Sequence, residues 1–370
     1  MGTINARKRK DGSIGYTAQI LRKKDGAIIW REAKTFDKER EAKAWIRWRE
    51  AELDKPGALE QLSKEDVPLA DAIDKYVGAK RTIGRTKEQV LRSIKTYPIA
   101  LKASRTIRSN DIVGFADELL AGGRKPQTVG NYISHLAAVF RDAKAAWDID
   151  LDYAEMQTAQ RTLTRLEKIS KSEERTRRPT LDELEMLMQH FADRQIRVPA
   201  SAPMCKIIAF GIFSTRRQEE ITRIAWDDLD EAHSRVLVRD LKHPGQKKGN
   251  NVWCELVPEA MAIVKSMPKT KREIFPYHAD TISAAFTRAT TFLGINKEGT
   301  PDEDRLVFHS LRHEGISRLF EMGRTIPLAA SVSGHRTWNS LKRYTDIKEV
   351  GDKYAGWKWL QVVTTGDKSA

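Results

Sequence analysis

Near the C-terminus the chain reads Gly334-His335-Arg336-Thr337-Trp338-Asn339-Ser340-Leu341-Lys342-Arg343-Tyr344. Two shorter segments lie upstream of it: His309-Ser310-Leu311-Arg312-His313 and, before that, Arg217-Gln218-Glu219-Glu220. A single histidine or tyrosine would say little. Two arginines, two histidines and a tyrosine in this order and at these spacings form a set, from which the rest of the chain can be interpreted.

The size and charge of the chain limit what it can do. Its 370 residues are enough for two or three domains that each bury a core. It carries 65 Lys and Arg against 51 Asp and Glu, a net charge of +14. Residues 1–50 alone hold 14 Lys and Arg against 7 Asp and Glu, which is half of that excess. This balance favours a polyanionic partner, although charge alone is equally compatible with a soluble protein that happens to be basic.

The cysteines and the apolar content point to the cytoplasm. Cys205 and Cys254 stand among apolar residues without CxxC or Cys/His ligand spacing, so we expect two reduced core residues. No run approaches the roughly 18 apolar residues of a membrane helix. The N-terminus also lacks the apolar segment of a signal peptide. We therefore expect a cytoplasmic protein.

Hydrophobic periodicity predicts a multidomain, mainly α fold. Residues 13–36 alternate in polarity, and a helical period follows them as far as Leu53. This pattern predicts a small β-sheet backed by one helix, in a domain that spans residues 1–58. Residues 66–160 show helical periods throughout and predict an all-helical domain.

A basic stretch separates these domains from a third one. Residues 161–179 are polar, rich in Arg and Lys, and end at a proline, which is typical of an interdomain linker. Residues 180–350 combine helical periods with strand patterns at 235–238 and 252–257, so they predict a mixed α+β domain with a hairpin. Residues 351–370 form a tail.

Arg217 and Arg312 are the candidates for binding a phosphodiester. The planar fork of a guanidinium matches the non-bridging oxygens of a phosphate better than the point charge of a lysine does. Arg217 also stands at the start of a predicted helix, whose dipole favours an anion. Taken singly, either arginine could be an ordinary surface or salt-bridged residue, and it is the set that favours a phosphate clamp.

His309 shares a helix face with Arg312, at i, i+3, and with His313, at i, i+4. Two histidines at this spacing could bind a metal, but the sequence offers no third ligand nearby and an arginine lies on the same face. Tyr344 is the candidate nucleophile, because a phenol of pKa about 10 can attack a phosphate when a base or a positive field assists it. The alternative for Tyr344 is a core tyrosine at the end of a helix.

Lys242 lies in the turn of the predicted hairpin. A flexible ammonium on such a loop can reach the leaving 5′ oxygen and give it a proton. The same loop holds Lys247 and Lys248, so the alternative is a basic hairpin that contacts a nucleic-acid backbone.

These segments resemble the boxes of the tyrosine recombinase (phage integrase) family. Residues 214–221 resemble the first arginine box, in which the catalytic arginine precedes an acidic residue by three positions, and this selects Arg217 over Arg216. Residues 309–313 resemble the His-x-x-Arg box. Gly334-His335 together with Tyr344 resembles the last box, and Lys242 matches the hairpin lysine.

The resemblance extends beyond the boxes. Residues 66–160 resemble the helical core-binding domain of these enzymes, and residues 5–55 resemble the arm-binding domain of phage integrases. The stretches 94–101 and 311–319 are similar to shufflon-type DNA invertases. One departure is Ser214-Thr215, where the family usually has Thr-Gly, and it affects a turn rather than a catalytic group.

The resemblance implies a site-specific recombinase of a phage or mobile element. It would break and rejoin double-stranded DNA through a 3′-phosphotyrosyl intermediate and a Holliday junction, with no cofactor and no metal. Arg217, Arg312 and His335 would hold the phosphate, His309 would take the proton of Tyr344, and Lys242 would protonate the leaving oxygen. Four protomers would act on two sites in the bacterial cytoplasm, at the nucleoid. Accessory DNA-bending or directionality proteins are candidate partners.

Basic residues outside the boxes are candidates for contacts with DNA phosphates. They are Arg22, Lys23, Lys24, Lys80, Arg81, Arg85, Lys87, Lys125, Arg175, Arg177, Arg178, Lys247 and Lys248. The tail is also expected to make a contact, because it carries large apolar side chains such as Trp357 and Trp359. It would pack on its own catalytic domain or, as in related recombinases, on a neighbouring protomer.

Three alternatives accompany this interpretation. The N-terminal domain favours an integrase, whereas the similarity to shufflon enzymes favours an invertase. A type IB topoisomerase would share the chemistry, but the arm-like domain and the short segment after Tyr344 argue against it. The complete set of six catalytic side chains argues against a non-catalytic DNA-binding regulator.

Overall fold

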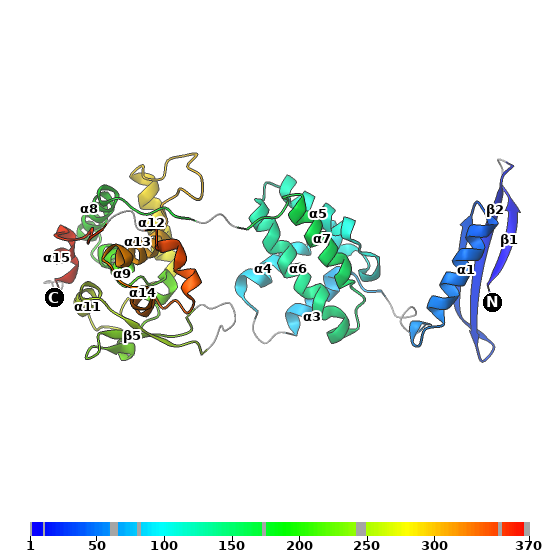
Figure 1. Cartoon of the computed structure of the whole chain (residues 1–370), viewed down its shortest axis with the longest axis horizontal. Coiled ribbons are helices and arrows are strands. Elements are labelled where there is room, and N and C mark those ends of the chain that lie inside the picture. Colours follow the sequence, from blue (N-terminus) through cyan, green and yellow to red (C-terminus); the bar gives the residue numbers. More distant parts are fainter. Residues whose placement is uncertain are drawn as a thin grey trace. The chain divides into compact units, whose positions relative to one another are not determined.

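The computed structural model of the chain describes residues 2–9, 12–59, 66–79, 83–171, 175–241, 249–346 and 350–365 (Figure 1). The chain divides into two compact units, residues 1–172 and 173–370. This division falls inside the basic stretch that the sequence predicts to be a linker.

The first unit begins with an antiparallel sheet in the order β1-β2-β3, formed by β1 (Thr3–Lys8), β2 (Ile14–Lys24) and β3 (Ala27–Phe36). Helix α1 (Glu39–Leu53) covers one face of the sheet (Figure 1) and packs Ala42 and Ile46 against Ala18 and Ile20. Because side chains alternate along a strand, Thr17 points to the opposite, open face. The Thr17 hydroxyl lies 3.0 Å from that of its cross-strand partner Thr35.

A second core in this unit is entirely helical. It is built by α3 (Leu69–Gly78), α4 (Arg85–Ile94), α5 (Ser109–Ala121), α6 (Pro126–Trp147) and α7 (Tyr153–Arg165), with 3-10 turns at Pro98–Leu101 and Ser104–Thr106. Helix α7 continues into the stretch expected to be a linker. Beyond it, Lys168 pairs with Asp117, and Ile169 packs against the helical core. The extended connection therefore begins later than residue 161.

The second unit holds α8 (Leu181–Arg197), α9 (Met204–Phe213), α10 (Gln218–Ile221), α11 (Pro258–Lys265), α12 (Ala279–Phe292), α13 (Phe308–Glu321), α14 (Ile326–Ser333) and α15 (Lys358–Thr364). A sheet of β4 (Leu229–Asp230), β5 (Arg235–Val238) and β6 (Val252–Glu255) contains the predicted hairpin. Short 3-10 turns lie at Trp226–Asp228, Trp338–Ser340 and Lys342–Tyr344. The expected fold class is confirmed: mainly α, with a small N-terminal sheet and helix, a helical domain and a mixed α+β domain.

Helices α9 and α13 form the centre of this unit. Every residue of α9 except the half-buried Cys205 is buried, as its mainly apolar sequence requires. Helix α13 packs directly on α9, and at Gly315 a β-carbon would lie only 1.9 Å from the carbonyl oxygen of Ile212. A residue other than glycine would separate the two helices, so Gly315 fixes the position of α13.

Glu314 and Arg318, two charged residues that α13 buries, are both paired. Glu314, which is 0% exposed, accepts hydrogen bonds from Arg178 Nε at 2.7 Å, Lys353 Nζ at 2.9 Å and Tyr354 Oη at 3.1 Å. One turn later, Arg318 pairs with Asp352 at 2.7 Å. These interactions bind both the segment before α8 and the start of the tail to α13.

The tail packs on its own unit. Tyr354, Trp359 and Val363 are buried in the same core as α9, and α15 contacts α9 and α11. The indole Nε1 of Trp359 donates a hydrogen bond to Glu185 at 2.7 Å. Of the two positions expected for the tail, the described residues 350–365 occupy the one on the chain's own domain.

The cysteines are free; Cys254 is buried and Cys205 half-buried against the core. Across the described ranges, no helix is long and apolar enough to span a membrane.

Candidate active site

A cavity of about 850 Å³ in the second unit brings together residues from all three segments that opened the sequence analysis. It lies between α10, the N-terminal half of α13, the end of α14 and the turns before Tyr344. Its lining consists of Arg216, Arg217, Gln218, Glu219, Glu220, Arg223, Leu241, Phe308, His309, Arg312, His313, Gly334, His335, Arg336, Thr337, Asn339, Ser340, Arg343 and Tyr344.

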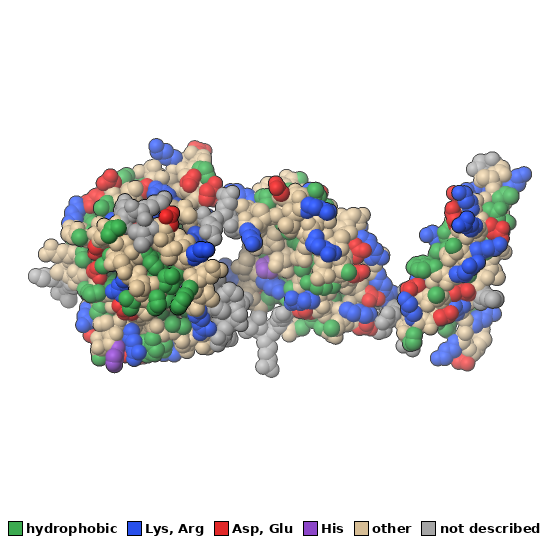
Figure 2. Space-filling view, in the orientation of Figure 1, with side chains coloured by type: hydrophobic (Ala, Val, Ile, Leu, Met, Phe, Trp, Pro, Cys, Tyr) green, Lys and Arg blue, Asp and Glu red, His purple; other side chains and the backbone are tan. Residues whose placement is uncertain are grey.

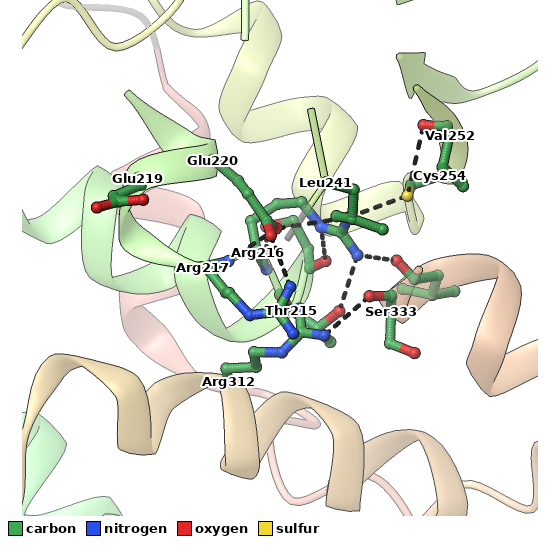
Figure 3. Close-up of polar contacts among 12 residues, drawn as sticks. Thr215, Arg216, Arg217, Glu219, Glu220, Leu241, Val252, Cys254, Arg312 and Ser333 are labelled. Atoms are coloured by element: carbon green, nitrogen blue, oxygen red, sulfur yellow. Dashed lines mark hydrogen bonds and ion pairs between the residues drawn. The ribbon is translucent and has the colours of Figure 1, made fainter. Parts of the chain in front are cut away.

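Two arginines reach this cavity from different elements (Figure 3). Arg217 is the N-cap of α10, and its Nη1 donates a hydrogen bond to Glu220 Oε1 at 2.8 Å. Arg312 projects from α13 and donates to the carbonyl oxygens of Thr215 and Ser333, the latter at 3.0 Å. These contacts hold both guanidiniums in fixed orientations, as recognition of a planar phosphate edge requires.

Arg216 has a different role from its neighbour. It is 1% exposed, and its guanidinium contacts Cys254 Sγ on β6 at 3.0 Å and the carbonyl oxygen of Val332 on α14 (Figure 3). Arg216 therefore ties the first arginine box to β6 and to the end of α14. The choice of Arg217 over Arg216 as the phosphate-binding arginine agrees with this geometry, because Arg217 has the more accessible side chain, at 29% exposed.

The cavity has an excess of positive charge. Burial, followed by the charges of Arg217 and Arg216, lowers the pKa of Arg312 to about 9, so the guanidinium is strained electrostatically but still cationic at neutral pH. Burial works to raise the pKa of Glu220, but the charges of Arg216, Arg312 and Arg217 outweigh it and the net pKa lies below its ordinary value. One carboxylate faces three guanidiniums, and an anion that entered the cavity would relieve their repulsion.

The cavity also holds His309, His313 and His335, which we call the three cavity histidines. Burial and then the charge of Arg312 lower the pKa of His309 to about 4 and that of His335 to about 3. For His313, burial and then His309 and Arg343 lower the pKa to about 3. All three imidazoles are therefore neutral at pH 7. His335 is oriented by Ser333 Oγ, 2.8 Å from its Nδ1, and places Nε2 3.3 Å from Arg312.

Tyr344 ends the last 3-10 turn and is 9% exposed. Its hydroxyl shares a 2.9 Å hydrogen bond with His313 Nδ1, and the guanidinium of Arg343 lies 5.6 Å from its ring centroid. Tyr344 thus sits at the wall of the cavity that the arginines line. The sequence analysis paired this hydroxyl with His309, whereas the hydrogen bond in the structure is to His313, one turn further along α13.

Two backbone positions beside the cavity have left-handed conformations. Thr215 has φ of +57°, which is unfavourable for a β-branched residue and explains why glycine would suit this place in the turn. Gly334 has φ of +71°, and a β-carbon there would lie 3.2 Å from Cys254 Sγ and 3.3 Å from Arg216 Nη1. Gly334 therefore allows the chain to turn from α14 to His335 directly over Arg216.

The structure brings together five of the six predicted catalytic residues: Arg217, His309, Arg312, His335 and Tyr344. The sixth, Lys242, lies outside the described residues. Sequence reasoning missed the organising role of Arg216 and the contact of His313 with Tyr344. The available signal for His313 was its i, i+4 spacing from His309, which suggested only a metal site. Within the described ranges, no group of three or more His, Cys, Asp and Glu is arranged to hold a metal ion.

The candidate DNA-binding residues have more varied surroundings. Lys80, Arg81, Lys247 and Lys248 lie outside the described residues. Lys23, Lys24, Arg85, Lys125 and Arg175 are exposed, and Lys87 donates to Tyr76 Oη at 2.5 Å.

Three of these arginines form ion pairs with carboxylates of the protein. Arg22 turns toward α1 and pairs with Asp54 at 2.8 Å and Glu50 at 3.4 Å. Arg177 pairs with Glu183, and Arg178 with Glu314 and Glu321. Each of these arginines therefore has an ion-pair partner within the protein, and its contact with DNA stays a prediction.

Comparison with known proteins agrees with this site. The profile of the phage integrase family matches residues 177–350, which contain the whole cavity. The shufflon-specific DNA recombinase of Escherichia coli is 32% identical over 295 residues, covering 76% of this chain and 69% of that protein. The chain belongs to the phage integrase family. It is therefore an enzyme, a tyrosine-type site-specific recombinase.

Solved structures of two integrases show the same fold. A lambda integrase dimer bound to a COC′ core site superposes with a TM-score of 0.60 at 19% identity, over 93% of this chain and 95% of that one. A lambda integrase tetramer bound to a Holliday junction gives 0.58 at 20% identity, over 94% of this chain and 97% of that one. The Tn1549 transposon integrase in complex with transposon right end DNA gives 0.55 at 15% identity, over 75% of this chain and 94% of that one.

Proposed function

We propose that this recombinase is the integrase of a phage or mobile element, which breaks and rejoins two DNA sites through a 3′-phosphotyrosyl intermediate and a Holliday junction. The observation that carries the proposal is the convergence of Arg217, His309, Arg312, His335 and Tyr344, from separate elements, on one cationic cavity. Such a cavity can bind a phosphodiester and present a tyrosine to it.

The phosphate is held by Arg217, Arg312 and His335. The two guanidiniums donate to the non-bridging oxygens, and their mutual repulsion falls when the anion binds. As the pentacoordinate transition state forms, negative charge grows on these oxygens while the donors are already in place. Each donor of this kind typically contributes about 10²–10³ in rate.

The phenol of Tyr344 attacks the phosphorus, forms the phosphotyrosyl bond and displaces the 5′ oxygen. We assign proton transfer at the nucleophile to His309 and protonation of the leaving oxygen to Lys242, the latter on the resemblance alone. The 5′ hydroxyl of the partner duplex reverses the step, so the phosphodiester energy is conserved and no nucleotide is consumed. The guanidiniums and imidazoles supply the charge stabilisation that a metal ion provides in other phosphoryl-transfer enzymes.

Contacts with DNA outside the cavity are proposed for two surfaces of the first unit. The first is the open face of the sheet, where the strand register aligns Arg7, Thr17, Thr35 and Arg31 on the side away from α1. The second is the N-terminal ends of α4 and α6, where Arg85 and Lys125 are exposed. Figure 2 shows Lys and Arg side chains spread over both parts of this unit, with Asp and Glu between them.

In the assembly that we propose, four protomers join two double-stranded sites in the bacterial cytoplasm, at the nucleoid, with accessory DNA-bending or directionality proteins as further partners. A second candidate function is inversion. It is favoured by the 32% identity to the shufflon-specific recombinase.

The two functions differ in the DNA that is recombined. Purified protein is given plasmids that carry the DNA flanking its own gene, as pairs of non-identical sites on two molecules or as identical inverted repeats on one. An integrase joins the non-identical sites between molecules. Recombination confined to identical inverted repeats would establish the invertase instead. Tyr344→Phe controls for contaminating recombinases.

A further inference from the structure

The hydrogen bond between Tyr344 Oη and His313 Nδ1 is not explained by the roles assigned above. It is 2.9 Å long and buried, and the two rings lie 5.5 Å apart at 39°. His309 lies next to His313, with ring centroids 5.0 Å apart. The imidazole that contacts the Tyr344 hydroxyl is therefore that of His313, and the histidine expected to act on Tyr344 lies one helical turn before it.

Both ends of this hydrogen bond are held firmly. On α13, His313 is followed by the buried Glu314 and by Gly315, whose close approach to Ile212 fixes the helix on α9. On the other side, the Tyr344 amide donates to the carbonyl oxygen of Leu341 at 2.9 Å, and Leu341 is 0% exposed. The position of Nδ1 thus determines where the tyrosine hydroxyl lies relative to the cavity.

The surroundings of His313 suit a hydrogen-bonding role. Arg312 and His309 on its own helix, and Arg343 and Tyr344 from the last turn, face its ring. Burial and these cations keep the imidazole of His313 neutral. A neutral imidazole can accept the phenol hydrogen bond through Nδ1 when its proton is on Nε2.

We propose that His313 is the positioning residue of the nucleophile: its Nδ1 holds the Tyr344 hydroxyl at the cavity wall and sets the direction of attack on the phosphate. The inference rests on the proposed function, since it needs Tyr344 to be the nucleophile. It adds a seventh side chain to the machinery and leaves proton transfer to other groups.

The test uses two polar replacements of similar character in the full-length protein. The amide of His313→Asn comes to the place of Nδ1, whereas that of His313→Gln comes to the place of Nε2. The measured quantities are the single-turnover rate of covalent adduct formation on a nicked suicide substrate, the affinity for that substrate and the melting temperature. His233→Gln, an exposed histidine on the same unit, is the control for loss of an imidazole.

We expect His313→Gln to form adduct about tenfold more slowly, which corresponds to one lost hydrogen bond, with unchanged DNA affinity. We expect His313→Asn to stay within about threefold of wild type. A Gln variant at the wild-type rate, or an Asn variant as slow as the Gln variant while both remain folded, would overturn the proposal. If His313→Gln does not fold, His313→Leu replaces it in the same comparison.

A second substrate distinguishes positioning of the nucleophile from protonation of the leaving 5′ oxygen. With a 5′-bridging phosphorothiolate, the thiolate leaves without a proton. The defect of His313→Gln should persist on this substrate, and its disappearance would place His313 on the leaving-group side. Failure of the wild-type enzyme to form any adduct, or an adduct formed by Tyr344→Phe, would instead refute the proposed function.

Discussion

Replacing Glu314 by glutamine should destabilise the catalytic unit although the residue does not touch the cavity. Its carboxylate is 0% exposed and serves Arg178, Lys353 and Tyr354 at 2.7, 2.9 and 3.1 Å. Removing one partner from a buried ion pair costs roughly 3–5 kcal/mol, because the other charge stays buried. Glutamine keeps one acceptor oxygen and Arg178 keeps Glu321, so we expect about 3 kcal/mol, the lower end of that range.

For a unit of this size the loss corresponds to a melting temperature about 6–12 °C lower. Tryptophan fluorescence can follow this unfolding, because the Trp357 ring lies 5.3 Å from the ring of Tyr354, a partner of Glu314. The matched control is Glu231→Gln, whose ion pair with Lys265 is 3.1 Å long but about half exposed, and which should cost less than about 1 kcal/mol. If the two variants have the same melting temperature, the buried ion pairs of Glu314 do not hold the tail and α13 in place.

Three further predictions concern the site and the domains. Arg217→Lys and Arg312→Lys should each slow adduct formation about 10²–10³-fold, while Arg288→Lys, on the exposed side of α12, leaves the rate unchanged in the same single-turnover assay. The pKa values of the three cavity histidines are lowered in the folded state, so their contribution to stability is complete above about pH 6.5 and is lost as the pH falls toward 4. The free energy of unfolding, measured by denaturant titration, should be higher at pH 7 than at pH 5 by roughly 1–2 kcal/mol per histidine. In the double variant His309→Gln/His335→Gln this free energy should depend less steeply on pH. Deletion of residues 1–58, which hold a core of their own, should spare cleavage of the core site and weaken binding to a second DNA sequence, and gel shifts on the two DNAs check this.

Sequence reasoning succeeded where one local pattern determines one element. The alternation of residues 13–36 fixed the hairpin of β2 and β3, and the apolar run before Ser214 fixed the buried helix α9. The spacing of an arginine three residues before Glu220 selected Arg217. In the structure that spacing lets Glu220 cap the amide of Arg217 and bind its side chain at the same time.

The sequence could not predict contacts that depend on how distant elements pack. The role of Arg216 depends on Cys254 and Val332, which tertiary structure alone brings to it. The pairing of Arg178 with Glu314 and Glu321 on α13 depends on tertiary packing in the same way. His313 shared a helix face with His309 in the sequence, but only the fold shows that the tyrosine hydroxyl lies against it.

The central claim is that Tyr344 becomes covalently joined to DNA. The direct measurement is the adduct formed on a suicide substrate in the presence of EDTA, separated under denaturing conditions and mapped by mass spectrometry of the modified peptide. The account predicts an adduct on the peptide that contains Tyr344, with a free 5′ hydroxyl on the released strand, and none with Tyr344→Phe although that variant still binds the DNA. An adduct on another residue, or an adduct that persists in Tyr344→Phe, would contradict it.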